Sequence, residues 1–283
     1  GLSGISLDGK NYYYSNPLRK IEGALDYEKM NVEFPERQPY LKCFCCPPNL
    51  VRTIAKSPGW AYSKSENGIA VNLYGGNELN TTLLDGSKIK LVQKTDYPWD
   101  GAVKITVEES KADTFEVLLR IPSWAKDTQI KVNGVAVENA APGTFARIER
   151  KWSAGDEITM DMPMETKFIE GHPRIEEVRN QVALKRGPVV YCIESADLPQ
   201  KTDITNVYLS SKKKLKPTSR PDFLGGVTTL EGEILLRKDK LGEMYQEVSE
   251  PEFQSFKTNF IPYYAWSNRG QGEMTVFLPV IWN

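Results

Sequence analysis

Apolar and polar residues alternate with a period of two along the chain from about residue 60 onward, and this pattern constrains the fold most strongly. Such alternation is typical of half-buried β-strands. Strands spaced near ten residues apart indicate an antiparallel sandwich or barrel rather than a parallel sheet. The clearest alternating segments are 69–73, 103–107, 115–119, 130–132, 135–137 and 158–162.

Turn and helix signals divide these segments. Asn133-Gly134 lies between two alternating runs and predicts a hairpin, because both central positions of a type I′ turn need a positive φ. Asp85-Gly86 and Asp100-Gly101 predict similar turns. Helical signals are few: the best covers 47–56, which two prolines open, and a weaker one covers 241–245.

A chain of 283 residues is long enough for two domains. We expect an irregular, cysteine-bearing region over 1–59, a sandwich over 60–165 and a second β-rich unit over 166–271. The strongly patterned last strand, within 272–283, is expected to return to the first sandwich, which makes the second unit an insertion.

Charge and hydropathy exclude some partners. With 36 basic and 37 acidic residues the net charge is −1, so neither nucleic acid nor an anionic membrane is expected as a partner. The basic run 212–214 is read as a solvated loop. No stretch approaches the ~18 apolar residues of a membrane helix, and no signal peptide is visible. Because the chain begins with Gly1 rather than Met, its start is expected to be a processing site or a cut within a longer sequence.

Three of the four cysteines, Cys43, Cys45 and Cys46, fall within four residues. A disulfide scaffold spreads its cysteines, so clustered thiols indicate metal ligands or reactive groups. Cys43 and Cys46 have the spacing of zinc knuckles and of dithiol redox sites, but the redox reading needs a βαβ context that is missing here. A zinc site needs four ligands, so any such site is completed by another part of the protein, or there is none here.

The prolines after Cys46 bear on thiol chemistry. Pro47-Pro48 starts the expected helix, which places Cys45 and Cys46 near a helix N-terminus. The dipole and unpaired N–H groups there favour a thiolate, and bound zinc favours it further. A nucleophile is one interpretation, and buried structural thiols beside a helix are the other; spacing alone does not decide between them.

Other residues that invite a chemical role have simpler interpretations. Cys192 lies in an apolar strand and is expected in the core, while His172 stands in a turn-like Gly-His-Pro tripeptide. Asp96 and Asp100 are expected to form turn hydrogen bonds rather than a glycosidase dyad. The aromatic cluster at 263–266 suits sugar stacking but is expected to be core.

The cysteine segment carries a resemblance to a known family. Cys43-Phe44-Cys45-Cys46-Pro47-Pro48-Asn49 resembles the signature of glycoside hydrolase family 127, whose bacterial members include β-L-arabinofuranosidases. The resemblance extends over nearly the whole chain. It includes the segments 2–9, 14–18, 95–101, 119–125, 185–191 and 261–270.

That resemblance implies a fold. Family members have an N-terminal (α/α)6 barrel followed by β-sandwich domains, and this chain resembles only their C-terminal portion. The expected class is therefore mainly β, with two antiparallel β-sandwich domains preceded by a short remnant of an α/α barrel in 1–59. The resemblance also implies that the second sandwich is inserted in the first.

The resemblance further implies roles for single residues. Cys45 would be the nucleophile and a zinc ligand, Cys46 a second zinc ligand, and Cys43 neither. Tyr14 would contact the substrate, a plant-derived arabinose-containing oligosaccharide. The remaining zinc ligands and the acid/base glutamate would lie on the upstream helical barrel of the same protein, so the chain alone is expected to be inactive.

Two other functions stay open at this point. The chain could serve as a non-catalytic accessory or carbohydrate-binding module, or as a redox or zinc-storage protein that uses Cys43 and Cys46. The resemblance indicates a bacterial protein and leaves the compartment, periplasmic or cytoplasmic, undecided.

Overall fold

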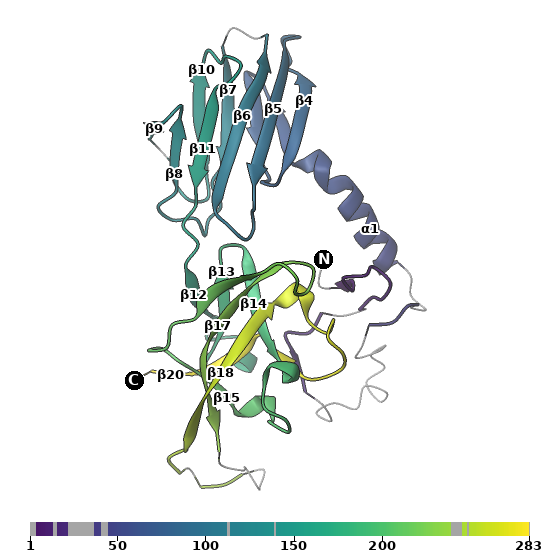
Figure 1. Ribbon diagram of the computed structural model, residues 1–283, viewed down its shortest axis with the longest axis vertical. Coiled ribbons are helices and arrows are strands. Elements are labelled where there is room, and N and C mark those ends of the chain that lie inside the picture. Colours follow the sequence, from purple (N-terminus) through teal and green to yellow (C-terminus); the bar gives the residue numbers. More distant parts are fainter. Residues whose placement is uncertain are drawn as a thin grey trace. The chain divides into compact units, whose positions relative to one another are not determined.

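A computed structural model describes residues 4–13, 16–21, 37–40, 45–111, 114–138, 140–238, 245–247 and 249–282. The chain divides into two compact units (Figure 1). We call Val51–Glu165 the sandwich unit, and Gly1–Leu50 together with Thr166–Asn283 the closed-sheet unit. Strands dominate both, so the mainly β class predicted from the alternation is confirmed.

The sandwich unit consists of two sheets. The four-stranded sheet has the order β10-β7-β3-β2, and the six-stranded sheet has the order β4-β5-β6-β11-β8-β9. All neighbours pair antiparallel except β3 and β7, which are parallel. The strands are β2 Tyr62–Ser65, β3 Gly68–Val71, β4 Asn77–Thr82, β5 Lys88–Thr95, β6 Ala102–Ser110, β7 Phe115–Arg120, β8 Gln129–Val132, β9 Val135–Val137, β10 Phe145–Arg150 and β11 Glu157–Asp161.

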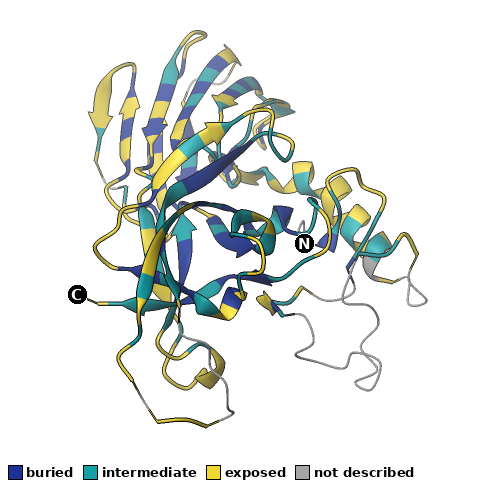
Figure 2. Cartoon of the chain, turned by 60° about the horizontal axis from the view of Figure 1, so that its bottom comes forward, coloured by how far each residue is buried: buried dark blue, intermediate teal, exposed yellow. Residues whose placement is uncertain are grey.

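Alternation places one side of each sheet in a shared core. On β6, Val103, Ile105 and Val107 are buried, whereas Lys104 and Thr106 between them are half-buried and the flanking Ala102 and Glu108 are exposed. Figure 2 shows buried and exposed residues alternating along these strands. The alternating segments predicted from the sequence therefore form strands as expected.

The predicted turns are also present. Asn133 and Gly134 adopt φ angles of 50° and 83° between β8 and β9, which is the positive φ that a type I′ turn needs. Asp85-Gly86 joins β4 to β5, and Asp100-Gly101 lies just before β6. Gly68 is required for close packing rather than for a turn, because a Cβ at this position would lie 2.0 Å from the backbone oxygen of Glu116 on the paired strand.

The closed-sheet unit has one ten-stranded sheet whose pairing path closes on itself. The central order β14-β18-β17-β15-β20-β13 returns to β14 through an additional β13–β14 pairing. Only β15 and β20 pair in parallel among these described strands. The strands are β1 Arg19–Lys20, β12 Thr166–Glu170, β13 Gln181–Arg186, β14 Val189–Glu194, β15 Val207–Ser210, β16 Lys216–Arg220, β17 Val227–Arg237, β18 Phe253–Pro262, β19 Met274–Thr275 and β20 Phe277–Ile281.

The last strand corrects one prediction. The sequence predicts that 272–283 returns to the sandwich of 60–165, but β19 pairs with β1 and β14, and β20 pairs with β13 and β15. All of these partners lie in the closed-sheet unit. Alternation identifies a half-buried strand but carries no information about which sheet supplies its neighbours, so the pattern alone could not assign it.

The described residues before Val51 also belong to the closed-sheet unit, so the unit boundary falls within the region predicted as 1–59. Arg19 and Lys20 pair with Thr275 and Met274, so the N-terminal segment extends the sheet by one short strand. Tyr12 forms isolated bridges with Ile5 and with Gln38, which places these three residues side by side.

One α-helix occurs among the described residues, α1 at Cys46–Lys56, which confirms the stronger helical prediction. Short 3-10 helices occupy Ser57–Trp60, Glu176–Val178, Ser195–Asp197, Ile204–Asn206 and Tyr263–Ala265. The weaker helical candidate at 241–245 lies almost entirely outside the described residues. In the described part of the chain, no helix has the length and apolar character that crossing a membrane requires.

Candidate active site

Cys45 stands directly before the only α-helix of the described chain. Its carbonyl oxygen accepts a hydrogen bond of 3.2 Å from the backbone N–H of Asn49, which makes Cys45 the cap of α1. The residue is exposed, and no acidic side chain lies in the first turn of the helix. The positive end of the helix dipole therefore acts near this thiol, and the first turn of α1 adds no negative charge that would oppose it.

The sequence explains why the helix starts here. Pro47 and Pro48 occupy the first turn, where a missing N–H costs nothing because the first helical N–H groups have no carbonyl partner. Lys56 in the last turn complements the opposite end of the dipole. Helix α1 thus holds the backbone of Cys45 and Cys46 in a defined conformation.

The other residues predicted for the site fall outside the described part. Tyr14 and Cys43 are not described, and neither is the side chain of Cys46, although its backbone begins α1. Cys45 is therefore the predicted site residue that the structure places. Among the described residues, no three His, Cys, Asp or Glu side chains form a group that could hold a metal.

Two adjacent cysteines at a helix start suit part of a zinc site by their donor chemistry. Zinc favours thiolate sulfur, and an exposed Cys45 is accessible to ligands from outside this chain. A tetrahedral site needs four donors, so two sulfurs from this segment fit half of one. The residues present are thus compatible with a shared zinc centre.

The residues beside Tyr14 are anchored on the closed-sheet unit. The ring of Tyr13 stacks on Trp266 with centroids 4.7 Å apart, and the guanidinium of Arg37 lies 4.7 Å from the Tyr13 centroid. Arg37 also donates a hydrogen bond of 2.6 Å to the carbonyl of Trp266. Trp266 is fully buried, so the expectation that 263–266 belongs to the core is confirmed for this residue.

Tyr263 anchors the chain on the other side of Tyr14. Its hydroxyl donates a hydrogen bond of 2.8 Å to the carbonyl oxygen of Pro17. Burial raises the pKa of Tyr263 to about 12, so the hydroxyl stays protonated and continues to donate at neutral pH. Residues 13 and 17, which flank Tyr14, are therefore both held by the segment at 263–266.

A buried charge cluster supports that segment, and sequence reasoning missed it. Arg269 hydrogen-bonds Glu194 at 2.9 Å through Nε and Asp197 at 2.7 Å through Nη1. Glu194 also accepts from the backbone N–H of Ser267. Burial lowers the pKa of Arg269, but the hydrogen bonds and charges of Asp197 and Glu194 outweigh it and raise the pKa overall. More than seventy residues separate the partners, so no local pattern pointed to the cluster.

The remaining candidates have the structural roles expected of them. Cys192 is buried on β14, and burial raises its pKa well above the usual value, which disfavours the thiolate. His172 is exposed in a loop, where Nδ1 accepts from the N–H of Arg174 at 3.3 Å. Asp100 accepts from the N–H of Ala102 at 2.7 Å, as expected of a turn carboxylate.

Comparison with known proteins shows which protein family the chain belongs to. Residues 1–59 match a family profile described as the β-L-arabinofuranosidase GH127 catalytic domain. Residues 68–164 match the GH127 middle domain, and 166–279 match the glycoside hydrolase family 127 C-terminal domain. These matches place the chain among the glycoside hydrolases.

More narrowly, the chain belongs to glycoside hydrolase family 127, as its cysteine motif predicted. It is 32% identical over 288 residues to a non-reducing end β-L-arabinofuranosidase of Bifidobacterium longum subsp. longum, which covers 98% of this chain and 43% of that protein. The C-terminal portion of a family 127 protein fits the whole chain.

Solved structures of family 127 proteins have the same fold as this chain. The fold matches a glycoside hydrolase with a TM-score of 0.91 and 43% identity, covering 99% of this chain and 46% of that one. It also matches a GH127 β-L-arabinofuranosidase from Geobacillus stearothermophilus T6 with a TM-score of 0.91 and 35% identity, covering 99% and 44%. The chain thus spans less than half the length of these relatives.

Proposed function

We propose that this chain supplies the nucleophile of a retaining glycoside hydrolase that releases β-linked L-arabinofuranose. The observation that carries the proposal is the position of Cys45, exposed at the N-terminus of α1 within the segment that matches the family's catalytic domain. The substrate class follows from the β-L-arabinofuranosidase names of the relatives.

The proposed chemistry balances as a double displacement. The Cys45 thiolate attacks the anomeric carbon, the glycosidic bond breaks, and a carboxylic acid protonates the leaving oxygen. Water then gives a proton to the same carboxyl group and attacks the anomeric carbon of the thioglycoside, which returns the thiolate, so the sugar leaves with its anomeric configuration retained. The acid/base glutamate is proposed to lie on the part of a longer protein that precedes this chain.

Zinc is proposed as the cofactor, held by Cys45 and Cys46 together with residues outside this chain. When bound, the metal supplies positive charge that keeps a coordinated thiol deprotonated at neutral pH. Cys45 contributes an exposed sulfur at the start of α1. Tyr14 is proposed to contact the sugar, because the neighbouring Tyr13 and Pro17 are held by the segment at 263–266.

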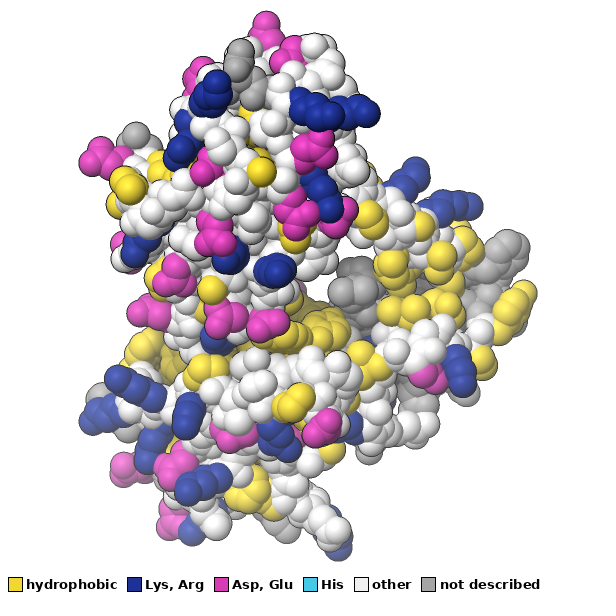
Figure 3. Space-filling model, turned by 45° about the horizontal axis from the view of Figure 1, so that its top comes forward, with side chains coloured by type: hydrophobic (Ala, Val, Ile, Leu, Met, Phe, Trp, Pro, Cys, Tyr) yellow, Lys and Arg dark blue, Asp and Glu magenta, His cyan; other side chains and the backbone are white. Residues whose placement is uncertain are grey.

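The surface of α1 supports the proposal that a helical region packs beside this segment. Val51 and Ile54 are 51% and 44% exposed on the helix, and Trp60, just beyond it, is 51% exposed. Figure 3 shows apolar side chains gathered over α1. Large apolar side chains gathered on one helix mark an interaction surface, and the upstream helical barrel implied by the family is the proposed occupant.

The proposal is tested in a protein that joins this chain to its catalytic region. Hydrolysis of an aryl β-L-arabinofuranoside is measured for Cys45→Ser and, as the matched control, for Cys43→Ser. We expect the first variant to lose turnover and the second to keep it. Equal turnover in the Cys45→Ser variant would remove the nucleophile assignment.

The isolated chain is proposed to be inactive, because the acid/base group and half of the zinc ligands are expected elsewhere. The same substrate assayed with the 283-residue chain alone tests this directly. Turnover by that chain would show that it contains a complete site of its own.

A further inference from the structure

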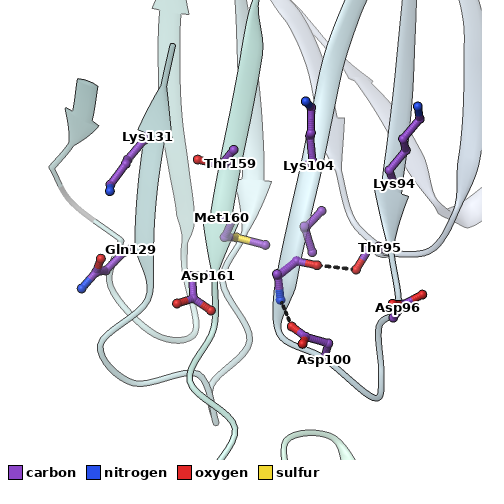
Figure 4. Close-up of a pocket in the computed structure, with 12 residues that line it drawn as sticks. Lys94, Thr95, Asp96, Asp100, Lys104, Gln129, Lys131, Thr159, Met160 and Asp161 are labelled. Atoms are coloured by element: carbon purple, nitrogen blue, oxygen red, sulfur yellow. Dashed lines mark hydrogen bonds between the residues drawn. The ribbon is translucent and has the colours of Figure 1, made fainter. Parts of the chain in front are cut away.

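The outer face of the six-stranded sheet carries a hollow of about 580 Å³ that the Cys45 chemistry does not use. Its walls come from β5, β6, β11 and β8 (Figure 4), all of which belong to the sandwich unit. The lining side chains are mostly polar. They are Lys94, Thr95, Asp96, Asp100, Ala102, Val103, Lys104, Gln129, Lys131, Thr159, Met160 and Asp161.

Strand register places hydrogen-bond donors in one row across the sheet. Lys94 pairs with Lys104, Lys104 with Thr159, and Thr159 with Lys131. Residues in register on neighbouring strands point to the same face. The row therefore presents three ammonium groups and one hydroxyl to solvent.

A second row, two residues further along the strands, presents acceptors. Asp161 pairs with Ala102 on one side and with Gln129 on the other, and Asp96 directly follows the end of β5. Figure 4 shows Thr159 between Lys131 and Lys104, and Asp161 between Gln129 and Asp100. Ala102 has the smallest side chain of the row, so the sheet is hollowed there.

Several of these groups have no partner in the described part of the chain. Lys104 pairs with Glu157, and Asp100 is occupied by the turn at Ala102. Among the described residues, Lys131 and Asp161 take part in no ion pair or side-chain hydrogen bond, and both are exposed. They are available to a ligand.

We propose that this hollow binds a neutral saccharide through its hydroxyl groups. A hydroxyl donates one hydrogen bond and accepts others, so a sugar ring lying over Ala102 accepts from the lysine row and donates to the aspartate row. Rows two residues apart on a strand are separated by ~6.6 Å, which suits one ring. The proposal does not depend on the reaction proposed for Cys45.

Charge and composition select this ligand class. The lining has three Lys and three Asp, so the hollow carries no net charge. For a uronate or phosphate, attraction to the lysine row is therefore offset by repulsion from the aspartate row. The lining contains no Phe, Tyr, Trp or His, so binding relies on hydrogen bonds rather than stacking.

The test is titration calorimetry of the 283-residue chain with a β-L-arabinofuranosyl disaccharide. We expect weak binding with little salt dependence. Asp161→Ala and Lys131→Ala are each expected to weaken it about tenfold, because each removes a charged hydrogen-bonding partner. Ala102→Leu, which fills the hollow, is expected to abolish binding.

Matched controls are Glu138→Ala and Lys88→Ala, exposed charges of the same unit outside the hollow, which should leave binding unchanged. Cys45→Ser should also leave it unchanged, which separates this site from the proposed active site. The proposal is overturned if Asp161→Ala and Lys131→Ala bind normally. It is equally overturned if Cys45→Ser removes binding, or if a galacturonate oligosaccharide binds more tightly with strong salt dependence.

Discussion

The indole of Trp266 stacks on the ring of Tyr13 with the two planes only 7° apart, so a residue near the start of the chain packs on one near its end. Tyr13 lies immediately before Tyr14, the proposed substrate contact. Trp266 lies three residues before Arg269, whose guanidinium is held by Glu194 and Asp197. Within the closed-sheet unit, the segment at 263–269 therefore holds Tyr13 in place beside the N-terminal part of the chain.

Removal of the Trp266 ring is expected to destabilise the protein strongly. The side chain is fully buried, and truncation of a buried aromatic residue costs ~3–5 kcal/mol. Urea unfolding of Trp266→Ala measures the loss. The matched control is Trp282→Ala, which removes a tryptophan that is 69% exposed and should change stability by under ~0.5 kcal/mol. Similar losses for both variants would contradict the packing described here.

Arg269→Met is expected to cost ~3–5 kcal/mol, because it leaves two buried carboxylates without their cation. The side chains of Glu194 and Asp197 are 8% and 4% exposed, so water cannot replace the lost partner. Arg174→Met, which removes an exposed arginine, serves as the control. An unfolding midpoint for Arg269→Met equal to that of the control would show that the cluster contributes nothing to stability.

Thiol labelling is expected to modify Cys45 much faster than Cys192. Cys45 is exposed, whereas Cys192 is buried and its pKa is raised, so both access and ionisation oppose its reaction. Peptide mapping by mass spectrometry after brief treatment of the native chain with iodoacetamide should find Cys45 modified and Cys192 intact. Modification of Cys192 at a comparable rate would show that β14 is accessible to the reagent.

Because the pKa of Asp156 is lowered, we expect the free energy of unfolding to depend slightly on pH. Its carboxylate accepts hydrogen bonds from the N–H of Ser153 and from Asn133, which lower its pKa below 3.8 in the folded state. A lowered folded-state pKa gives stability that is present above the unfolded-state value and is lost as pH falls through the folded one. Asp156→Asn should therefore lose less stability than the wild type between about pH 6 and about pH 3. An acid loss in the Asp156→Asn variant equal to that of the wild type would contradict the assignment.

Gly68→Ala is expected to cost at least ~2 kcal/mol, because its Cβ would meet the Glu116 carbonyl and force β3 away from β7. Gly76→Ala is the control, since nothing lies within 4 Å of a Cβ at that position. Thermal unfolding of the two variants gives the comparison. A Gly68→Ala protein as stable as the control would mean that the β3–β7 pairing is looser than described.

The parts of this molecule that sequence could predict are those with short-range causes. The alternation of Val103, Ile105 and Val107 specifies a strand, and Asn133-Gly134 specifies a hairpin, because each effect acts between near neighbours. Pro47 likewise marks the start of α1. The cysteine motif identified the family because its residues are consecutive.

The parts that sequence could not predict depend on distant partners. The sheet that receives β20 is set by β13 and β15, and the Arg269 cluster is set by two carboxylates more than seventy residues earlier. The hollow at Ala102 arises from register across four strands. Each of these needs pairings that a single local pattern does not encode.

The central claim is that the sulfur of Cys45 forms the bond to the sugar, and its most direct test is to find that bond. The enzyme that contains this chain and its catalytic region is incubated with an activated β-L-arabinofuranoside, quenched in acid and digested, and the mass of each peptide is measured. The account predicts one pentosyl group attached to the peptide that contains Cys45. A pentosyl group on a carboxylate peptide, with the Cys45 peptide unmodified, would contradict it.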